Sequence, residues 1–287
     1  MHEEITFSSD GLKLKGVLHF PGNNSDGPYA VIALLHGFGV SKDMDDYLTC
    51  ADLLTNLGYA CLRFDFRGCG ESEGEPGHVI CMEQVQDTKN AVSYLRERSD
   101  IDPERIAVLG HSFGAAVAAY AGGVDKRIAA VISSCGWGDG ERKFRKQHES
   151  PESWKGFSDR LQEGKEHFQK TGNSLMFNRW DIVPIPEHLR ANLTGKVHME
   201  FPYVTVQSMV DFRANEVVGE ISPRPLLLLH AADDSVTPTE QSIELFEHAG
   251  QPTDLVLLAG IDHFPLAESN SRARKVLKDW LDHYLPA

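Results

Sequence analysis

The sequence has few cysteines, and none of them is spaced as a redox pair or a metal site. The five cysteines are an odd number without a C-x-x-C pair, and the thirteen histidines show no H-E-x-x-H or similar spacing. A disulfide framework and a zinc centre are therefore not expected. We expect no metal and no cofactor, and free cysteines fit a reducing, cytoplasmic location.

The sequence also lacks long apolar runs and an excess of positive charge. No apolar run reaches the roughly 18 residues that a membrane-spanning helix needs, and the acidic start Met1-His2-Glu3-Glu4 does not resemble an export signal. The formal net charge is −14, which repels phosphate backbones. We expect neither nucleic acid nor a membrane as a partner, and the sequence leaves a homodimer open.

Strand-like and helical patterns alternate along most of the chain. Segments 5–8 and 12–20 alternate and predict a hairpin, and short apolar runs typical of buried parallel strands follow. These runs are at residues 30–35, 60–64, 106–109, 129–133, 225–229 and 254–258. Helical patterns lie at residues 45–57, 80–98, 113–121, 239–248 and 271–285. The alternation predicts an α/β fold with a mostly parallel eight-stranded sheet, helices on both faces and the hairpin at one edge.

Residues 137–215 interrupt this alternation and are more helical than strand-like. The segment is too long for a structureless loop, so we expect a helical cap inserted into one core domain of residues 1–136 and 216–287. A cap of this kind would lie over the strand ends, where ligands bind in open α/β sheets. The candidate substrate contacts are Phe38, Trp137, Phe177 and Trp180, although the aromatic residues of the segment could equally form its own small core.

A short basic run lies near the start of the same segment. Residues 141–146, Glu-Arg-Lys-Phe-Arg-Lys, carry four positive charges in six positions. The run could attract a substrate with a carboxylate, although a solvated helix face is the more common use of such a run.

The pentapeptide Gly110-His111-Ser112-Phe113-Gly114 matches the pattern G-x-S-x-G. It directly follows the apolar run 106–109 and precedes a helix of small residues, which is the context that a nucleophilic serine needs. We expect Ser112 on a tight strand-to-helix turn with its hydroxyl exposed. Side chains at positions 110 and 114 would collide with neighbouring elements there, and glycine removes the collision.

Together with other segments, this motif resembles the α/β-hydrolase superfamily, in its group of acyl esterases, feruloyl-type esterases and S33-like or S9-like peptidases. The resemblance implies the α/β-hydrolase fold and a serine hydrolase, but it does not specify a substrate. The matching segments follow one another in order along nearly the whole chain: residues 36–39 (HGFG), 63–72 (RFDFRGCGES), 110–114, 234–238 (DSVTP) and 262–264 (DHF).

The resemblance also implies the partners of Ser112. A serine hydroxyl needs a base, and the base needs an orienting acid. The superfamily order of serine, acid and histidine makes His263 the base and selects Asp234, four residues before Pro238, as the acid. Asp233 and Asp139 remain alternatives for the acid.

The same resemblance places the oxyanion hole. An oxyanion needs preorganised N–H donors in a dry site, and the implied donors are the backbone N–H groups of Phe38 and Phe113. We therefore expect a carboxylesterase-like serine hydrolase that cleaves the ester of a small apolar or aromatic substrate through an acyl-enzyme intermediate. A peptidase or amidase, or a hydrolase of carbon–carbon bonds, would use the same triad, so the expected partner is a small-molecule ester or amide.

Overall fold

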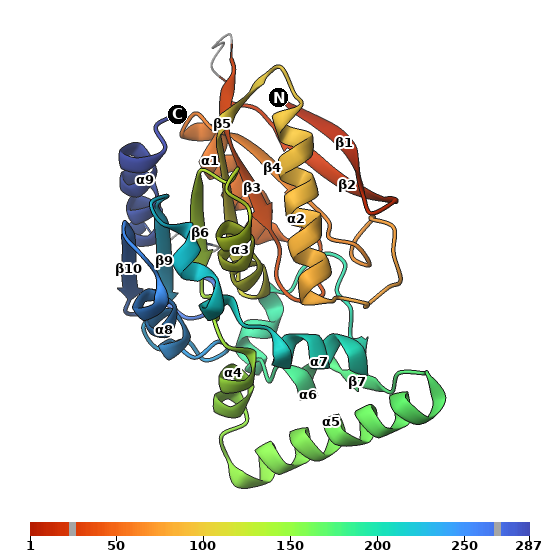
Figure 1. The fold of residues 1–287 in the computed structure, drawn as a ribbon. Coiled ribbons are helices and arrows are strands. Elements are labelled where there is room, and N and C mark those ends of the chain that lie inside the picture. Colours follow the sequence, from red (N-terminus) through yellow and green to blue (C-terminus); the bar gives the residue numbers. More distant parts are fainter. Residues whose placement is uncertain (23–26, 267–270) are drawn as a thin grey trace.

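A central eight-stranded sheet organises the computed structural model, which describes residues 1–22, 27–266 and 271–287 (Figure 1). The strand order is β1-β2-β4-β3-β5-β6-β9-β10; β1 and β2 are antiparallel, and the strands from β4 to β10 are parallel. The predicted sheet and its edge hairpin are therefore confirmed. The strands are β1 (His2–Ser9), β2 (Leu12–His19), β3 (Tyr29–Leu35), β4 (Ala60–Phe64), β5 (Ile101–His111), β6 (Ala130–Ser134), β9 (Leu226–Ala231) and β10 (Thr253–Leu258).

Helices cover both faces of this sheet, as right-handed crossovers between parallel strands require (Figure 1). Crossovers that move from β4 toward β10 place their helices on one face, and the crossover from β3 back to β4 places its helix on the other. The first face carries α2 (Cys81–Arg96), α3 (Phe113–Val124) and α8 (Glu240–His248). The second carries α1 (Asp45–Asn56) and α9 (Ser271–Tyr284).

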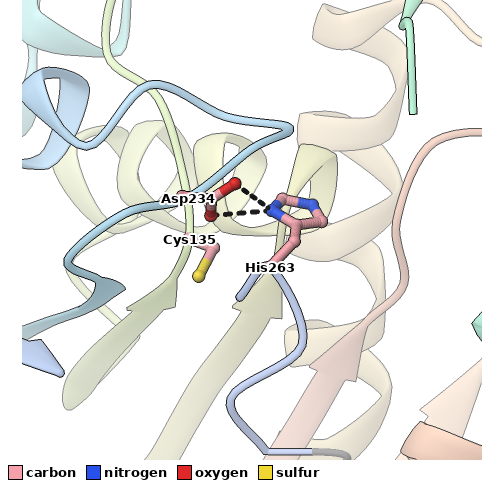
Figure 2. Close-up of side chains that lie close together, drawn as sticks. All are labelled: Cys135, Asp234 and His263. Carbon is pink, nitrogen blue, oxygen red and sulfur yellow. Dashed lines mark hydrogen bonds and ion pairs between the residues drawn. The ribbon is translucent and has the colours of Figure 1, made fainter. Parts of the chain in front are cut away.

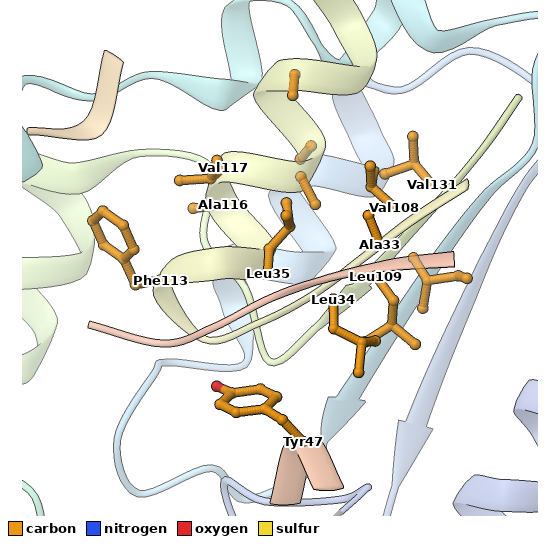
Figure 3. Packing of buried hydrophobic residues seen from close by; sticks show 14 of the residues in the cluster. Ala33, Leu34, Leu35, Tyr47, Val108, Leu109, Phe113, Ala116, Val117 and Val131 are labelled. Carbon is orange, nitrogen blue, oxygen red and sulfur yellow. The ribbon is translucent and has the colours of Figure 1, made fainter. Parts of the chain in front are cut away.

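The central strands are apolar at consecutive positions because both of their faces are buried. Figure 3 shows Leu35 of β3 pointing toward Val117 of α3, while Leu34 points to the opposite face, where Tyr47 of α1 lies. Neither leucine is more than 2% exposed. This double-sided packing holds the carboxyl end of β5, and with it Ser112, between two layers of helices.

The chain between β6 and β9 forms a separate layer beyond the carboxyl ends of the strands (Figure 1). Besides its helices it contains a small antiparallel sheet of β7 and β8 that the sequence patterns did not predict. Its elements are α4 (Gly140–Gln147), α5 (Pro151–Thr171), β7 (Met176–Asn178), α6 (Arg179–Ile182), η1 (Glu187–Asn192), β8 (Glu200–Pro202) and α7 (Tyr203–Asp211). The chain then returns to β9 through η2 (Ala214–Glu216) and η3 (Val218–Ile221), which pack against α3. Within the ranges described, every helix is too short or too polar to cross a membrane.

Candidate active site

Ser112 lies on a sharp turn between β5 and α3. Its backbone has φ 56° and ψ −117°, a conformation that is strained for a residue with a side chain. An added Cβ at Gly110 would be 2.0 Å from the carbonyl oxygen of Gly114, and one at Gly114 would be 2.1 Å from that of Leu35. The expected collisions are confirmed, and the two glycines are what permits the turn.

Three side chains from separate strand ends form one hydrogen-bonded chain. Nε2 of His263 lies 2.9 Å from Oγ of Ser112, and Nδ1 of His263 lies 2.8 Å and 3.0 Å from the two carboxylate oxygens of Asp234. Figure 2 shows the contacts between His263 and Asp234. A carboxylate can only accept, so Nδ1 donates to Asp234, and Nε2 is left to accept the hydroxyl hydrogen of Ser112. This is the protonation pattern of a general base.

The side chain of Asp234 is buried, and both of its carboxylate oxygens have hydrogen-bond partners. Its Oδ1 accepts hydrogen bonds from the backbone N–H groups of Val236 and Thr237 at 2.8 and 2.7 Å, and its Oδ2 lies 3.3 Å from Nε2 of His230. Burial by itself would raise the pKa of Asp234, but the charges and hydrogen bonds of His263 and His230 outweigh it and hold the pKa well below its usual range. The carboxylate therefore stays ionised beside the base.

The other two acidic candidates lie away from His263. Asp233 is exposed, and Asp139 caps α4, where it accepts from the backbone N–H of Arg142 at 3.0 Å and pairs with Arg213 at 3.5 Å. Both alternatives are therefore wrong as the acid of this cluster.

Asp262 has a different task, because it ties together the loops that carry the acid and the base. Its carboxylate accepts from the backbone N–H groups of Ser235 and His263 at 2.9 and 2.8 Å. It also accepts from the hydroxyl of Ser235 at 2.8 Å.

The loop after β3 presents the second expected oxyanion donor. In the described part of the chain, neither Phe38 nor Phe113 has an acceptor for its backbone N–H. The neighbouring peptide groups are held in place: the N–H of Gly37 donates to the hydroxyl of Tyr47 at 2.7 Å, and the carbonyl of Gly37 accepts from Nδ1 of His36 at 2.9 Å. Two free N–H groups on a fixed backbone are what a preorganised oxyanion hole needs.

Ser112 and His263 line a narrow pocket that is partly open to solvent. Phe38 and Trp137 line it, as expected. Most of the remaining wall is apolar and comes from both the core and the inserted segment: Val40, Met44, Val183, Ile185, Leu193 and Met209.

The prediction that Phe177 and Trp180 contact the substrate is wrong for this pocket. Both side chains line a separate surface hollow beside α5. Phe177 packs under the guanidinium of Arg160, and Trp180 packs under that of Arg190, 4.3 Å from its ring centre. Aromatic composition therefore identified the segment but not which of its rings face Ser112.

Two cations from the inserted segment also line the pocket, and sequence reasoning missed them as individual residues. Arg179, which is 2% exposed, donates to the carbonyls of Phe38 and His198 at 2.6 and 3.0 Å. Its guanidinium thus holds the oxyanion loop from the outside, and burial lowers its pKa to about 10. The second cation is Lys143 of α4. The described lining residues include no Asp or Glu.

One group in the described part of the chain has the spacing of a metal site, and it overlaps the cluster at Ser112. The thiol of Cys135 and the ligand atoms of Asp234 and His263 lie within 4.8 Å of one another (Figure 2). Burial raises the pKa of the Cys135 thiol well above its usual range, which disfavours the thiolate that a metal would need. A metal here would also compete with the hydrogen bond between Asp234 and His263.

This fold and strand-end cluster define an α/β hydrolase. The family model described as "Serine aminopeptidase, S33" matches residues 26–270, and the chain belongs to this family. Its superfamily, expected from the sequence, is thereby confirmed.

The chain is similar in sequence to two named proteins. It is 37% identical over 139 residues to the quorum-quenching protein AidA of Acinetobacter baumannii, a match that covers 48% of this chain and 44% of that protein. It is 29% identical over 278 residues to the polyketide transferase grgF of a Penicillium species, which covers 91% of this chain and 88% of the relative.

Solved structures show the same fold. The crystal structure of the α/β hydrolase GrgF from Penicillium superposes with a TM-score of 0.81 at 22% identity, over 99% of each chain. Est1E from Butyrivibrio proteoclasticus, solved with ferulic acid bound, superposes with a TM-score of 0.74 at 18% identity, over 99% of this chain and all of the other. The esterase domain of a Rhodothermus marinus protein has the same fold, with a TM-score of 0.64 at 22% identity over 99% of each chain.

Proposed function

We propose that this protein is a serine hydrolase that cleaves carboxylic esters through an acyl-enzyme intermediate. The observation that carries the proposal is the chain of hydrogen bonds from Ser112 through His263 to Asp234, with spacings of 2.9 and 2.8 Å, at the floor of a largely apolar pocket. The inserted segment would act as the cap that closes this pocket over the substrate.

The steps follow from where the protons lie. Nε2 of His263 accepts the hydroxyl proton as Oγ of Ser112 attacks the ester carbonyl, and the ionised Asp234 stabilises the resulting imidazolium. The N–H groups of Phe38 and Phe113 would bind the negative oxygen that forms. His263 then returns the proton to the leaving alcohol, and the same base activates water to release the acid.

The lining of the pocket argues against an aminopeptidase, despite the description of the family. A substrate with a free amino terminus carries a positive charge that needs an acidic group near the scissile bond. The described lining residues offer the cations Lys143 and Arg179 instead. We therefore favour a neutral or anionic ester over a peptide.

Acyl transfer is the second candidate function. The similarity to a polyketide transferase extends over 91% of the chain, and an acyl-enzyme can pass its acyl group to an alcohol or thiol as readily as to water when such an acceptor occupies the pocket. Adding primary alcohols to the hydrolysis assay and measuring the ratio of new ester to free acid distinguishes the two fates.

The test of the proposal is the loss of turnover in Ser112→Ala. We expect kcat/KM for p-nitrophenyl butyrate to fall about 10³–10⁶-fold and fluorophosphonate labelling to disappear, while the melting curve is retained. Ser158→Ala, which alters a half-buried serine on α5 outside the pocket lining, should keep both activity and labelling. Turnover or labelling that survives in Ser112→Ala would refute the proposal.

A further inference from the structure

The basic run on α4 divides into three surface cations and one buried cation. Arg142 pairs with Glu244 at 3.2 Å, Arg145 with Glu141 at 3.2 Å, and Lys146 with Glu149 at 2.8 Å, and all three side chains are more than half exposed. Lys143 is 2% exposed and lines the pocket that contains Ser112. The solvated helix face therefore explains three of the four charges but not Lys143.

Lys143 is held by aromatic rings rather than by an acid. Its Nζ lies 4.0 Å from the ring centre of Phe144 and 5.5 Å from that of Trp137. No described residue accepts a hydrogen bond from it, and the ionisable group that influences it is the thiol of Cys81. Burial raises the pKa of that thiol to about 12, so Cys81 is neutral near pH 7 and supplies no counter-charge.

A buried ammonium without an acceptor lowers the stability of the free protein, because desolvation disfavours the charge and cation–π contacts offset only part of that cost. Burial accordingly lowers the pKa of Lys143 to about 7. A ligand that brings an anionic oxygen into the pocket would supply the missing acceptor and raise that pKa again. Arg179 is less available, since its Nη1 and Nη2 already donate to two carbonyls and only its buried Nε has no acceptor among the described residues.

We propose that Lys143 is the specificity-determining residue of the pocket and binds a carboxylate that the substrate carries in addition to its ester group. The preferred substrates would then be monoesters of acids that carry a second carboxylate, or esters of alcohols that carry one. The apolar walls would hold the carbon chain between the two ends, and Lys143 would pair with the carboxylate by a charge-assisted hydrogen bond. This inference rests on the ester hydrolysis proposed above.

The experiment compares charged and neutral esters of matched size. One pair varies the acyl side, mono-p-nitrophenyl glutarate against p-nitrophenyl valerate, and one varies the alcohol side, 4-carboxyphenyl butyrate against 4-methylphenyl butyrate. For at least one pair we expect the wild-type kcat/KM to favour the charged ester, and Lys143→Met to reduce that preference at least tenfold, mainly through KM.

The control is Lys146→Met, which removes an exposed charge three residues further along the same helix. It should leave the preference within about twofold, because an exposed charge is screened by solvent. Retained fluorophosphonate labelling and a cooperative melting curve would show that Lys143→Met is folded with its nucleophile intact. A preference that is absent in the wild type, or that Lys143→Met leaves unchanged for both pairs, would overturn the proposal.

A binding measurement separates this inference from the proposed function. Glutarate should bind the wild type at least ten times more tightly than it binds Lys143→Met in isothermal titration, whether or not the protein hydrolyses any ester. Equal affinities would contradict the role of Lys143, whereas tight glutarate binding without ester turnover would contradict only the proposed function.

Discussion

The two sides of the pocket differ in how completely their charged groups are paired. On the side of the sheet, Ser112, His263 and Asp234 form a closed chain, and both oxygens of Asp234 are engaged. On the side of the inserted segment, the two terminal nitrogens of Arg179 donate to backbone carbonyls, but Lys143 has no acceptor among the described residues. We infer that the sheet side is organised for one reaction and that the inserted side is left ready to bind a partner.

We expect the largest loss of activity from a substitution on the sheet side of the pocket, at Asp234. Asp234→Asn keeps the shape of the side chain but removes the negative charge that orients His263 and stabilises its protonated form. We expect kcat for p-nitrophenyl butyrate to fall about 10³–10⁴-fold. Asp233→Asn, at the exposed neighbouring position, should stay within about twofold. Equal losses in the two variants would mean that the closed chain is not the reactive unit.

A smaller effect is expected at Arg179, where the two sides meet. Its guanidinium donates to the carbonyl of Phe38, and the ring of Phe201 stacks on that of Phe38 with centres 4.1 Å apart. Arg179→Met should let the oxyanion loop shift and lower kcat about 10–100-fold, with little change in KM.

The matched control is Arg190→Met, which alters an exposed arginine over Trp180 in the same segment. It should leave kcat within about threefold. A rise in KM alone for Arg179→Met would place this residue in substrate binding, and the inserted side would then hold no part of the reaction machinery.

The sheet side could be predicted from the sequence because its determinants are local. An apolar run followed by G-x-S-x-G fixes both the end of β5 and the strained turn, since Gly110 and Gly114 are excluded from bearing side chains by backbone contacts within five residues or to the next strand. The superfamily order then predicted Asp234 and His263. Cys135 was missed because it meets the acid only across the sheet, and His230, four residues before Asp234, was missed because no motif marks that position.

The inserted side resisted prediction for the opposite reason, because tertiary packing decides which of its residues face the pocket. Phe177, Trp180 and Trp137 are all aromatic, and residue type alone does not distinguish them. Only Trp137 closely follows a strand of the eight-stranded sheet, and only Trp137 lines the pocket. For Lys143 the sequence contains one local signal, because the residue lies on the buried face of α4 with Gly140 and Phe144. A helical pattern centred on Phe144 could have singled it out from the other three cations.

The smallest predicted effect is on the melting temperature. It tests whether the buried charge of Lys143 lowers the stability of the folded protein when no ligand is bound. Its pKa is about 7 in the folded chain against 10.5 for an ordinary lysine, so between these values the unfolded chain binds more protons and the folded state becomes more stable as the pH rises. Lys143→Met should therefore raise the melting temperature by about 2–4 °C at pH 6.5. The gain should shrink toward zero by pH 10.5, where the lysine is neutral in the folded chain and about half deprotonated in the unfolded chain, and Lys146→Met should show no such dependence. A melting temperature that falls equally at both pH values would mean that Lys143 stabilises the fold, and the contrast between the two sides of the pocket would lose its physical basis.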